Sequence, residues 1–425
     1  MQITRQAGSD RLHRDGKGYV LQMSEPAVVI LSKPVAPQPD GSYNPVVVAW
    51  LYNKNGMAAW CWEAAHALHE LGHSVILVAS IDADLPGNPA FEVLRIDSPD
   101  KPARRSGRLQ KLGVPFSRFL SAEPDGLLAQ IHKELTARSL KPLAYVLNQS
   151  SLVDRSVSCP QLVAAWAYPT TLFGYLRKVP RLAPDKSVRA LLRTALHGIG
   201  WWRKDWRGYR MADRVLPVTA ALMRSLSSRS VSSDLAYPGT CIGPPPICDG
   251  EKVRLFMAAV NLSEPRKRIL WMLKAMKGMT LPQGTVLQLA GEADLSVRQA
   301  AVKLGFPVEF LGHLKREDLQ RVMQQASIFC FGSLLDDWGY VLVEAMANGL
   351  VPVAPGISPF DEIIGEIGSS YKPGSQQDFV RALQSIATGS LAEKRCEAWN
   401  RAQTLFSRAS FGRAILRSVA STTRP

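Results

Sequence analysis

The stretch from Ile328 to Pro355, IFCFGSLLDDWGYVLVEAMANGLVPVAP, constrains the fold of this chain more than any other. A short apolar run at its start predicts a buried strand, and a loop with glycine and acidic residues follows. The next residues, Tyr340 to Asn348, have a helical pattern that stops at Gly349, where a left-handed C-cap residue is expected. A second apolar run, Leu350 to Ala354, completes a unit of strand, loop, helix and strand.

Two carboxylates lie eight residues apart in this segment, Asp336 in the loop before the helix and Glu344 inside the helix. The N-terminus of a helix has unpaired N–H groups and a partial positive charge, which suits a phosphate. A carboxylate beside it can accept hydrogen bonds from neighbouring hydroxyl groups. Phosphate with sugar hydroxyls on both sides describes a nucleotide sugar. The alternative is that Asp336 and Asp337 only cap the helix.

The run from Asp336 to Gly349, DDWGYVLVEAMANG, resembles the E-x7-E motif of the retaining glycosyltransferase family 4, the glycosyl transferases group 1. The resemblance implies a GT-B fold, in which two Rossmann-like domains face a central cleft and a C-terminal helix crosses back to the first domain. It covers roughly Pro45 to Ala420 in order. The chain departs from the motif at Asp336, where the family usually has Glu, so the reach to the sugar is shorter by one methylene.

A second unit begins at Pro45, where the apolar run PVVVAWLY is followed by the loop NKNGM, the helical stretch AAWCWEAAHALHEL and the apolar run SVILVAS. This pattern predicts two parallel strands joined by a right-handed helical crossover. The resemblance implies that the first loop lies near the donor diphosphate. The family often has two glycines there, and Gly56 is the residue that the resemblance assigns to this role.

The end of the same helix spells HELGH at residues 69–73, the HExxH signature of zinc metalloproteases. Gly72 is followed directly by the β-branched run Ser74 to Ser80. We therefore expect the helix to end at Leu71 and His73 to point off the helix axis. A zinc protease is the remote alternative, and no metal site is expected.

The resemblance extends to two further loops. The stretch NLSEPRKR, residues 261–268, resembles the family's GR....RKG loop, in which Lys267 matches the lysine that neutralises the donor diphosphate. Asn261 stands where the usual arginine would be, which leaves Arg266 or Arg268 as the second cation. Residues 308–314 resemble the loop that contacts the nucleotide base. The resemblance assigns catalysis to Lys267 and Asp336, and donor binding to Gly56, Asn261, Arg266, Lys267, His313, Leu314, Asp336, Trp338, Gly339, Tyr340 and Glu344.

The length of 425 residues exceeds one typical core and predicts two domains. We expect an N-terminal extension at 1–44 and an acceptor domain at 45–245, with the C-terminal helix 405–425 added to it. The nucleotide-sugar domain is expected at 246–404. The chain has no apolar run of about 18 residues and no signal peptide, which predicts a cytoplasmic protein without a spanning helix.

The formal net charge of +15 needs an explanation. Residues 174–214 carry many lysines and arginines with tryptophans interleaved at helical spacing. This composition predicts an interfacial helix that meets an anionic membrane surface or a lipid-linked phosphate, which would make the protein peripheral at the inner face of the membrane. An ordinary amphipathic helix with tryptophans in the core is the alternative. No nucleic-acid-binding module surrounds the segment, so nucleic acid is not an expected partner.

The implied reaction is transfer of a sugar from a nucleoside-diphosphate sugar to a glycan, a lipid-linked acceptor or another hydroxyl, with retention at the anomeric carbon. A cation and helix N–H groups can stabilise the leaving diphosphate, so no metal or other cofactor is expected. The alternative from another class is a non-catalytic nucleotide-binding protein with the same fold, motivated by the unusual residues Asn261 and Asp336.

Overall fold

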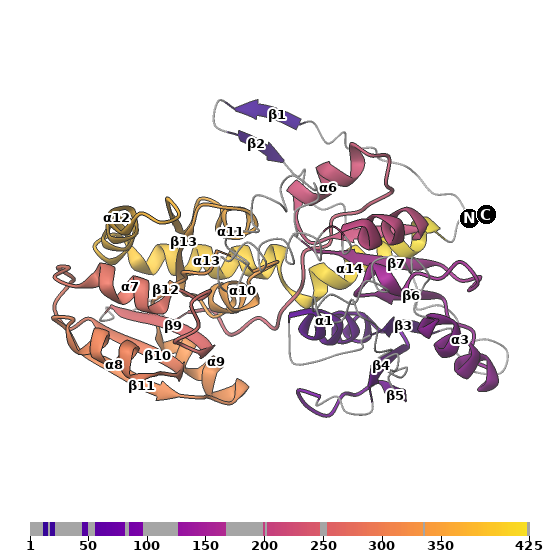
Figure 1. Cartoon of the computed structure of the whole chain (residues 1–425), viewed down its shortest axis with the longest axis horizontal. Coiled ribbons are helices and arrows are strands. Elements are labelled where there is room, and N and C mark those ends of the chain that lie inside the picture. The colour runs from indigo at the N-terminus through magenta and orange to yellow at the C-terminus, as the bar shows by residue number, and fades with distance from the viewer. Residues whose placement is uncertain are drawn as a thin grey trace, which may run out of the picture. The chain divides into compact units, whose positions relative to one another are not determined.

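The computed structural model describes residues 12–15, 18–21, 45–49, 56–80, 85–96, 126–166, 199, 202–246, 253–334 and 336–422. The chain divides into two compact units, Met1–Tyr43 and Asn44–Pro425. In the first unit, β1 (Leu12–Asp15) and β2 (Gly18–Leu21) form an antiparallel hairpin. The second unit contains the other described elements, which build an α/β structure (Figure 1).

The first sheet of the larger unit has six parallel strands in the order β5-β4-β3-β6-β7-β8. Its strands are β3 (Val46–Ala49), β4 (Val75–Ser80), β5 (Glu92–Ile96), β6 (Ala144–Leu147), β7 (Gln161–Ala165) and β8 (Arg214–Pro217). Its helices include α1 (Gly56–Glu70), α3 (Leu127–Ala137) and α6 (Ala220–Ser227), and residues 202–211 are also helical. Every residue of β4 is buried, as expected for parallel strands that are covered on both faces. The predicted unit of strand, helix and parallel strand after Pro45 is confirmed.

The second sheet is also six-stranded and parallel, in the order β11-β10-β9-β12-β13-β14. Its strands are β9 (Arg254–Asn261), β10 (Val286–Glu292), β11 (Val308–Gly312), β12 (Ile328–Cys330), β13 (Val351–Pro355) and β14 (Ser369–Tyr371). The helices that follow β9 are α7 (Ile269–Met276), α8 (Leu295–Val302), α9 (Arg316–Gln325), α10 (Tyr340–Ala347), α11 (Phe360–Ile364), α12 (Gln376–Ala387), α13 (Leu391–Leu405) and α14 (Arg408–Thr422). The stretch from Ile328 to Pro355 therefore forms β12, α10 and β13, as its pattern predicts.

The strand order reverses once in each sheet, between β3 and β6 in the first and between β9 and β12 in the second. In open α/β sheets, ligands bind outside the carboxyl ends of the strands at such a reversal. The loops that leave β9 and β12 contain Lys267 and Asp336. The topology alone therefore places both predicted catalytic residues beside the reversal point of the second sheet.

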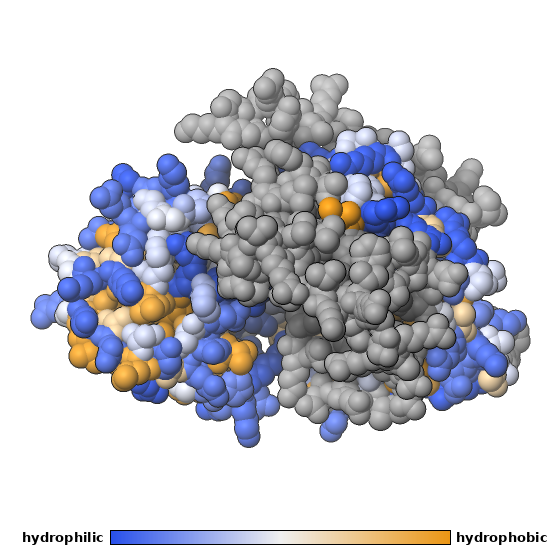
Figure 2. All heavy atoms as spheres, in the orientation of Figure 1, coloured by the Kyte–Doolittle hydropathy of each residue, from blue (hydrophilic) through white to orange (hydrophobic). Residues whose placement is uncertain are grey.

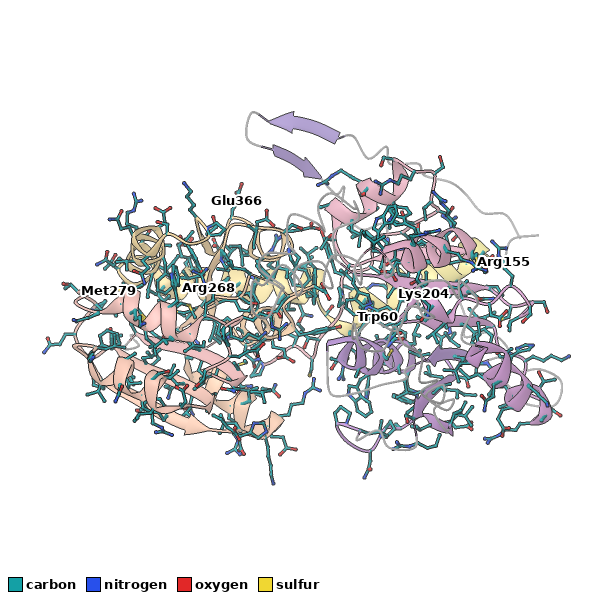
Figure 3. The ribbon with its side chains drawn as sticks, in the orientation of Figure 1. Trp60, Arg155, Lys204, Arg268, Met279 and Glu366 are labelled. Carbon is teal, nitrogen blue, oxygen red and sulfur yellow. The ribbon has the colours of Figure 1, made fainter. Side chains whose placement is uncertain are left out.

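The last helix, α14, returns to the first sheet and packs against α1. Trp60 of α1 is fully buried there, with its ring 5.4 Å from that of Phe411 in α14 (Figure 3). Gly412 permits this close approach, since a β-carbon at that position would lie 2.7 Å from Leu71 and 2.9 Å from the carbonyl oxygen of Ala67. At Gly412 the expected crossing of the C-terminal helix thus brings α14 close to the backbone of α1.

On the face seen in Figure 2, hydrophobic residues gather over α8, β10 and β11, at the edge of the second sheet. Leu295 and Val302 of α8 are among the exposed large hydrophobic side chains. None of the helices in the described part of the chain combines the length and the hydropathy that crossing a bilayer requires.

Candidate functional site

Lys267 and Asp336 meet at the carboxyl edge of the second sheet. The Nζ atom of Lys267 lies 2.8 Å from Oδ2 of Asp336, and Nη1 of Arg266 lies 3.1 Å from Oδ1 of the same carboxylate. Only 19% of the Lys267 side chain and 13% of the Asp336 side chain are exposed. One carboxylate therefore holds two cations together in a partly desolvated place, where electrostatic interactions are stronger than in water.

Arg266, rather than Arg268, provides the second cation of this cluster. The Nε atom of Arg266 also pairs with Glu264 at 2.7 Å. Burial lowers the pKa of Arg266, but hydrogen bonding to Glu264 and the charge of Asp336 raise it by more. The net shift is upward, so the guanidinium stays charged. The guanidinium of Arg268 instead lies 3.9 Å from the ring centre of Trp271, at the start of α7 (Figure 3).

Two glycines shape the loop after β12, and the first of them allows this loop to approach the loop after β9. A β-carbon at Gly332 would lie 2.8 Å from the carbonyl oxygen of Lys267, so a larger residue would push the two loops apart. Gly339 is the N-cap residue of α10, with a φ of 89° and no side-chain capping bond. Asp336 is therefore not the N-cap residue. The amide of Leu342 donates to the carbonyl of Gly339, and the amides of Tyr340 and Val341, which have no partner among the described residues, remain available to an anion.

Glu344 and Tyr340 place two further polar groups on α10. Burial raises the pKa of Glu344, the charge of Arg316 opposes this, and the charge of Glu63 adds to it. Burial also raises the pKa of Tyr340 well above its usual value, with a contribution from Glu344. The Tyr340 hydroxyl is buried and has no hydrogen-bond partner among the described residues. A ligand hydroxyl near this carboxylate would satisfy the phenol, which the described residues leave unpaired.

A buried ion network lies next to Glu344. The Glu63 side chain, 3% exposed, accepts hydrogen bonds from Arg316 at 2.8 Å and from Arg408 at 2.5 Å. These residues come from α1, α9 and α14 and are separated by 253 and 345 positions in the chain. Sequence analysis missed the network. Its one local signal was a carboxylate in the otherwise apolar stretch AAWCWEAAHAL.

Trp338 packs in the core, which corrects the prediction of a donor contact. The residue is 2% exposed, and its ring is stacked on that of Tyr237 at a distance of 5.6 Å. The ring of Phe406 lies edge-on at the same distance. The Tyr237 hydroxyl donates a hydrogen bond of 2.6 Å to Glu362, which also accepts from the amide of Ala220 at the start of α6. Trp338 thus anchors the loop after β12 instead of presenting its ring to a ligand.

The other predicted donor-binding residues occupy different positions. Asn261 is exposed, and its Oδ1 atom accepts a hydrogen bond from the amide of Ser263, so it shapes its own turn. His313 is exposed and follows Gly312, whose φ is 66°. Leu314 is partly buried and packs against the core. Gly56 is the first residue of α1, and the loop that precedes it lies outside the described residues.

The HELGH sequence does not form a continuous helical pair of histidines. Helix α1 ends at Glu70, one residue before the predicted end, and Gly72 has a left-handed φ of 84°. The amide of His73 donates to the carbonyl of Leu68 in the pattern of a helix C-terminus. His69 and His73 therefore do not share a helix face, which the metalloprotease motif requires. Within the described part of the chain, no group of three or more potential metal ligands is present.

Of the basic segment 174–214, the structure describes residue 199 and residues 202–214. Trp206 is 6% exposed and belongs to the core beside the first sheet, as the alternative of a packed amphipathic helix predicts. Asp205 also faces inward, where it accepts a hydrogen bond from Ser150, and burial raises its pKa to about 6. A β-carbon at Gly208 would lie 2.2 Å from the carbonyl oxygen of Ser150, which explains a glycine inside this helix.

Residues 249–404 match the family model of the glycosyl transferases group 1. A phosphatidyl-myo-inositol mannosyltransferase from Mycobacterium leprae is 28% identical over 149 residues, and this match spans 34% of the present chain and 39% of the relative. Sucrose-phosphate synthase from Thermosynechococcus elongatus has a TM-score of 0.61 at 15% identity, covering 89% of this chain and 98% of the other. HepE from Anabaena, in complex with UDP, has a TM-score of 0.58 at 16% identity, covering 89% and 100%. These likenesses show that the chain has the predicted GT-B fold.

Proposed function

We propose, from the premise that residues 249–404 belong to the glycosyl transferases group 1 family, that this protein is a glycosyltransferase. Its donor is a nucleoside-diphosphate sugar, and its acceptor is a hydroxyl of a glycan or of a lipid-linked molecule. The observation that carries the proposal is the cluster of Arg266, Lys267 and Asp336 at the reversal point of the second sheet. The UDP bound to the structurally similar HepE supports a nucleotide as part of the donor.

The described residues suit the departure of a diphosphate. In the proposed reaction, the bond between the anomeric carbon and the diphosphate oxygen breaks, and the acceptor oxygen bonds to the same face of the sugar. The leaving phosphate takes the acceptor proton. Lys267, Arg266 and the first-turn amides of α10 stabilise the negative charge that develops on the diphosphate, without a metal. Asp336 acts at the transferred sugar, and Glu344 accepts hydrogen bonds from the ribose hydroxyls.

The proposal is tested by a screen of UDP-, GDP- and ADP-sugars for slow hydrolysis by the purified protein. We expect one donor class to be hydrolysed, with unchanged rates after addition of EDTA, and with the anomer first released having the configuration of the donor. Lys267→Ala should abolish most of this hydrolysis. Lys274→Ala is the matched control, because it removes the same charge from an exposed position on the adjacent helix α7.

A non-catalytic nucleotide-binding protein is the second candidate, because Asn261 replaces the arginine of the family's loop. Nucleotide binding without hydrolysis or transfer from any donor in the screen would favour this candidate. The position of Arg266 argues for catalysis, since its guanidinium is a second cation, 3.1 Å from the Asp336 carboxylate.

A further inference from the structure

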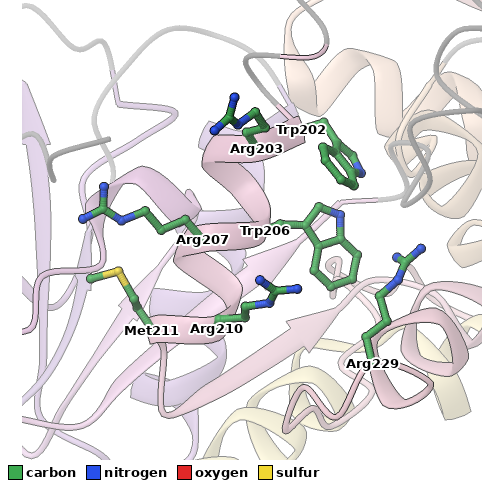
Figure 4. Close-up of a pocket in the computed structure, with 7 residues that line it drawn as sticks. All are labelled: Trp202, Arg203, Trp206, Arg207, Arg210, Met211 and Arg229. Carbon is green, nitrogen blue, oxygen red and sulfur yellow. The ribbon is translucent and has the colours of Figure 1, made fainter. Parts of the chain in front are cut away.

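A pocket of about 630 Å³ lies beside the helix formed by residues 202–211 (Figure 4). It is lined by Trp202, Arg203, Trp206, Arg207, Arg210, Met211 and Arg229. Six of these residues belong to the helix, and Arg229 follows α6. The lining includes no residue of the second sheet or of its donor loops, so this is a place separate from the proposed transfer site.

The helix divides its side chains by charge. Arg203, Arg207 and Arg210 are spaced by four and three residues and therefore share one side of the helix, and all three are exposed. Asp205 lies on another side and is bound to Ser150 in the interior. In the part of the chain that the structure describes, no carboxylate lies within salt-bridge distance of the three arginines. Like charges at these spacings destabilise a helix, and a bound anion would remove that repulsion.

The floor of the pocket is apolar. Trp202 and Trp206 form this floor with ring centres 6.4 Å apart, whereas Met211 lies on the opposite side of the helix (Figure 4). The guanidinium of Arg229 lies 4.4 Å from the ring centre of Trp206, so cationic and aromatic groups are in direct contact. Because Trp206 is almost fully buried, it cannot insert into a membrane as the sequence composition suggested. The contact surface is instead a cationic rim over an apolar floor.

This combination favours one ligand chemistry. Guanidinium groups match the oxygens of a phosphate in geometry and charge. A free phosphate would leave the apolar floor in contact with water. An uncharged hydrocarbon ligand would leave the positive charge of the arginines without a counter-charge. A phosphate joined to an apolar group satisfies both parts. We propose that this pocket binds the phosphate headgroup of an anionic membrane lipid, with the adjoining apolar part of the lipid against Trp202.

The test is binding of the full chain to vesicles of phosphatidylcholine alone and of phosphatidylcholine mixed with phosphatidylglycerol. We expect binding only to the mixed vesicles, and weaker binding as salt screens the charges. Arg207→Gln combined with Arg210→Gln should lower the partition coefficient about 25-fold, since each basic residue near an anionic surface contributes about fivefold. Both side chains are exposed, so thermal unfolding should not change.

The matched control combines Lys133→Gln with Arg155→Gln, which removes the same charge from exposed positions of the same unit that do not line the pocket. This control should bind like the wild type. An equal loss in both double variants would show general electrostatic attraction and overturn the proposal, as would failure of the wild type to bind mixed vesicles at low salt.

Two further measurements separate a lipid from a phosphate ion. Phosphatidylglycerol with brominated acyl chains should quench part of the tryptophan fluorescence, and Trp202→Phe should remove that part. Inorganic phosphate at the concentration of the accessible lipid should not displace the vesicles; displacement would mean that the pocket takes the ion alone. None of these readouts uses a nucleotide sugar, so they succeed or fail independently of the proposed glycosyl transfer.

Discussion

The carboxylate of Asp336 lies within hydrogen-bond distance of both Lys267 and Arg266 at the edge of the second sheet. Because these side chains extend from loops held by neighbouring strands, the cations are in position before a ligand arrives. Glu344 differs from Asp336, since no cation lies within salt-bridge distance of it among the described residues and burial raises its pKa. A separate prediction therefore follows for each of these residues.

Lys267→Ala should reduce turnover by about 100- to 1000-fold, because a well-placed charge on the leaving group contributes about 3 to 4 kcal/mol to the transition state. Asp336→Ala should impair transfer while sparing affinity for the bare nucleoside diphosphate, which has no transferred sugar. Rates with the donor found in the screen and calorimetric titration with the nucleotide check both statements. Full activity of both variants would show that the site lies elsewhere.

Nucleotide affinity should fall on acidification, because an ionised Glu344 accepts the ribose hydroxyls better than a protonated one. The pKa of Glu344 is raised above its ordinary value of 4.5, so the loss should begin above the usual carboxyl range. The sign for stability is the reverse: a raised carboxyl pKa favours the protonated folded state, and that contribution is lost as pH rises through it. Glu344→Gln should weaken binding and flatten its pH dependence, measured by titration. An unchanged pH profile in the variant would contradict the assignment.

At the scale of elements, helix ends in the second half of the chain are joined by one buried arginine. Arg395 of α13 is almost fully buried, and its Nε atom donates to the carbonyl of Gly349 at 3.1 Å, just beyond α10. Its Nη2 atom donates to the carbonyl of Gln324 at 3.3 Å, in the last turn of α9. The last carbonyls of a helix lack partners within the helix and carry a partial negative charge. One guanidinium therefore donates hydrogen bonds to carbonyls at the C-terminal ends of two helices.

Arg395→Leu should lower the free energy of unfolding by about 3 kcal/mol, since hydrogen bonds to a charged group contribute about 1.5 to 3 kcal/mol each and the carbonyls would remain buried. Urea denaturation followed by circular dichroism measures the change. Arg417→Leu on α14 is the control, because that side chain is exposed, and it should change stability by less than about 0.5 kcal/mol. Equal effects of the two substitutions would refute the role of Arg395.

At the scale of the larger unit, Glu63 connects helices from both ends of the chain. Its carboxylate is paired with Arg316 at the start of α9 and with Arg408 at the start of α14. Arg408 also pairs with Glu70, which is half-exposed. The interaction crosses from the layer of the first sheet to that of the second, so it stabilises the arrangement of α1, α9 and α14 rather than any one helix.

Glu63→Gln should lower the free energy of unfolding by about 2 to 4 kcal/mol, because removing one partner of a buried ion pair leaves the others uncompensated. Glu70→Gln removes a carboxylate from the same helix and the same arginine at an exposed position, and it should cost about 1 kcal/mol or less. Urea denaturation of the two variants and the wild type provides the comparison. A cost for Glu70→Gln as large as for Glu63→Gln would contradict the assignment to burial.

Local sequence patterns determined much of the secondary structure. The apolar run at Pro45 and the helical period after Gly56 predict β3 and α1, and the glycine at position 349 marks the end of α10. These features depend on neighbours within a few positions, since periodicity and capping are local properties.

Only the tertiary structure decided which distant residues meet. Two arginines were equivalent in the sequence, and the fold placed Arg266 on Asp336 and Arg268 on Trp271. The motif resemblance could not show that Trp338 is stacked on Tyr237, 101 positions earlier, or that Glu63 pairs across 345 positions. Such contacts depend on strand order and on how helices pack. Both are set by the summed burial of many side chains, and no single stretch of the chain contains that information.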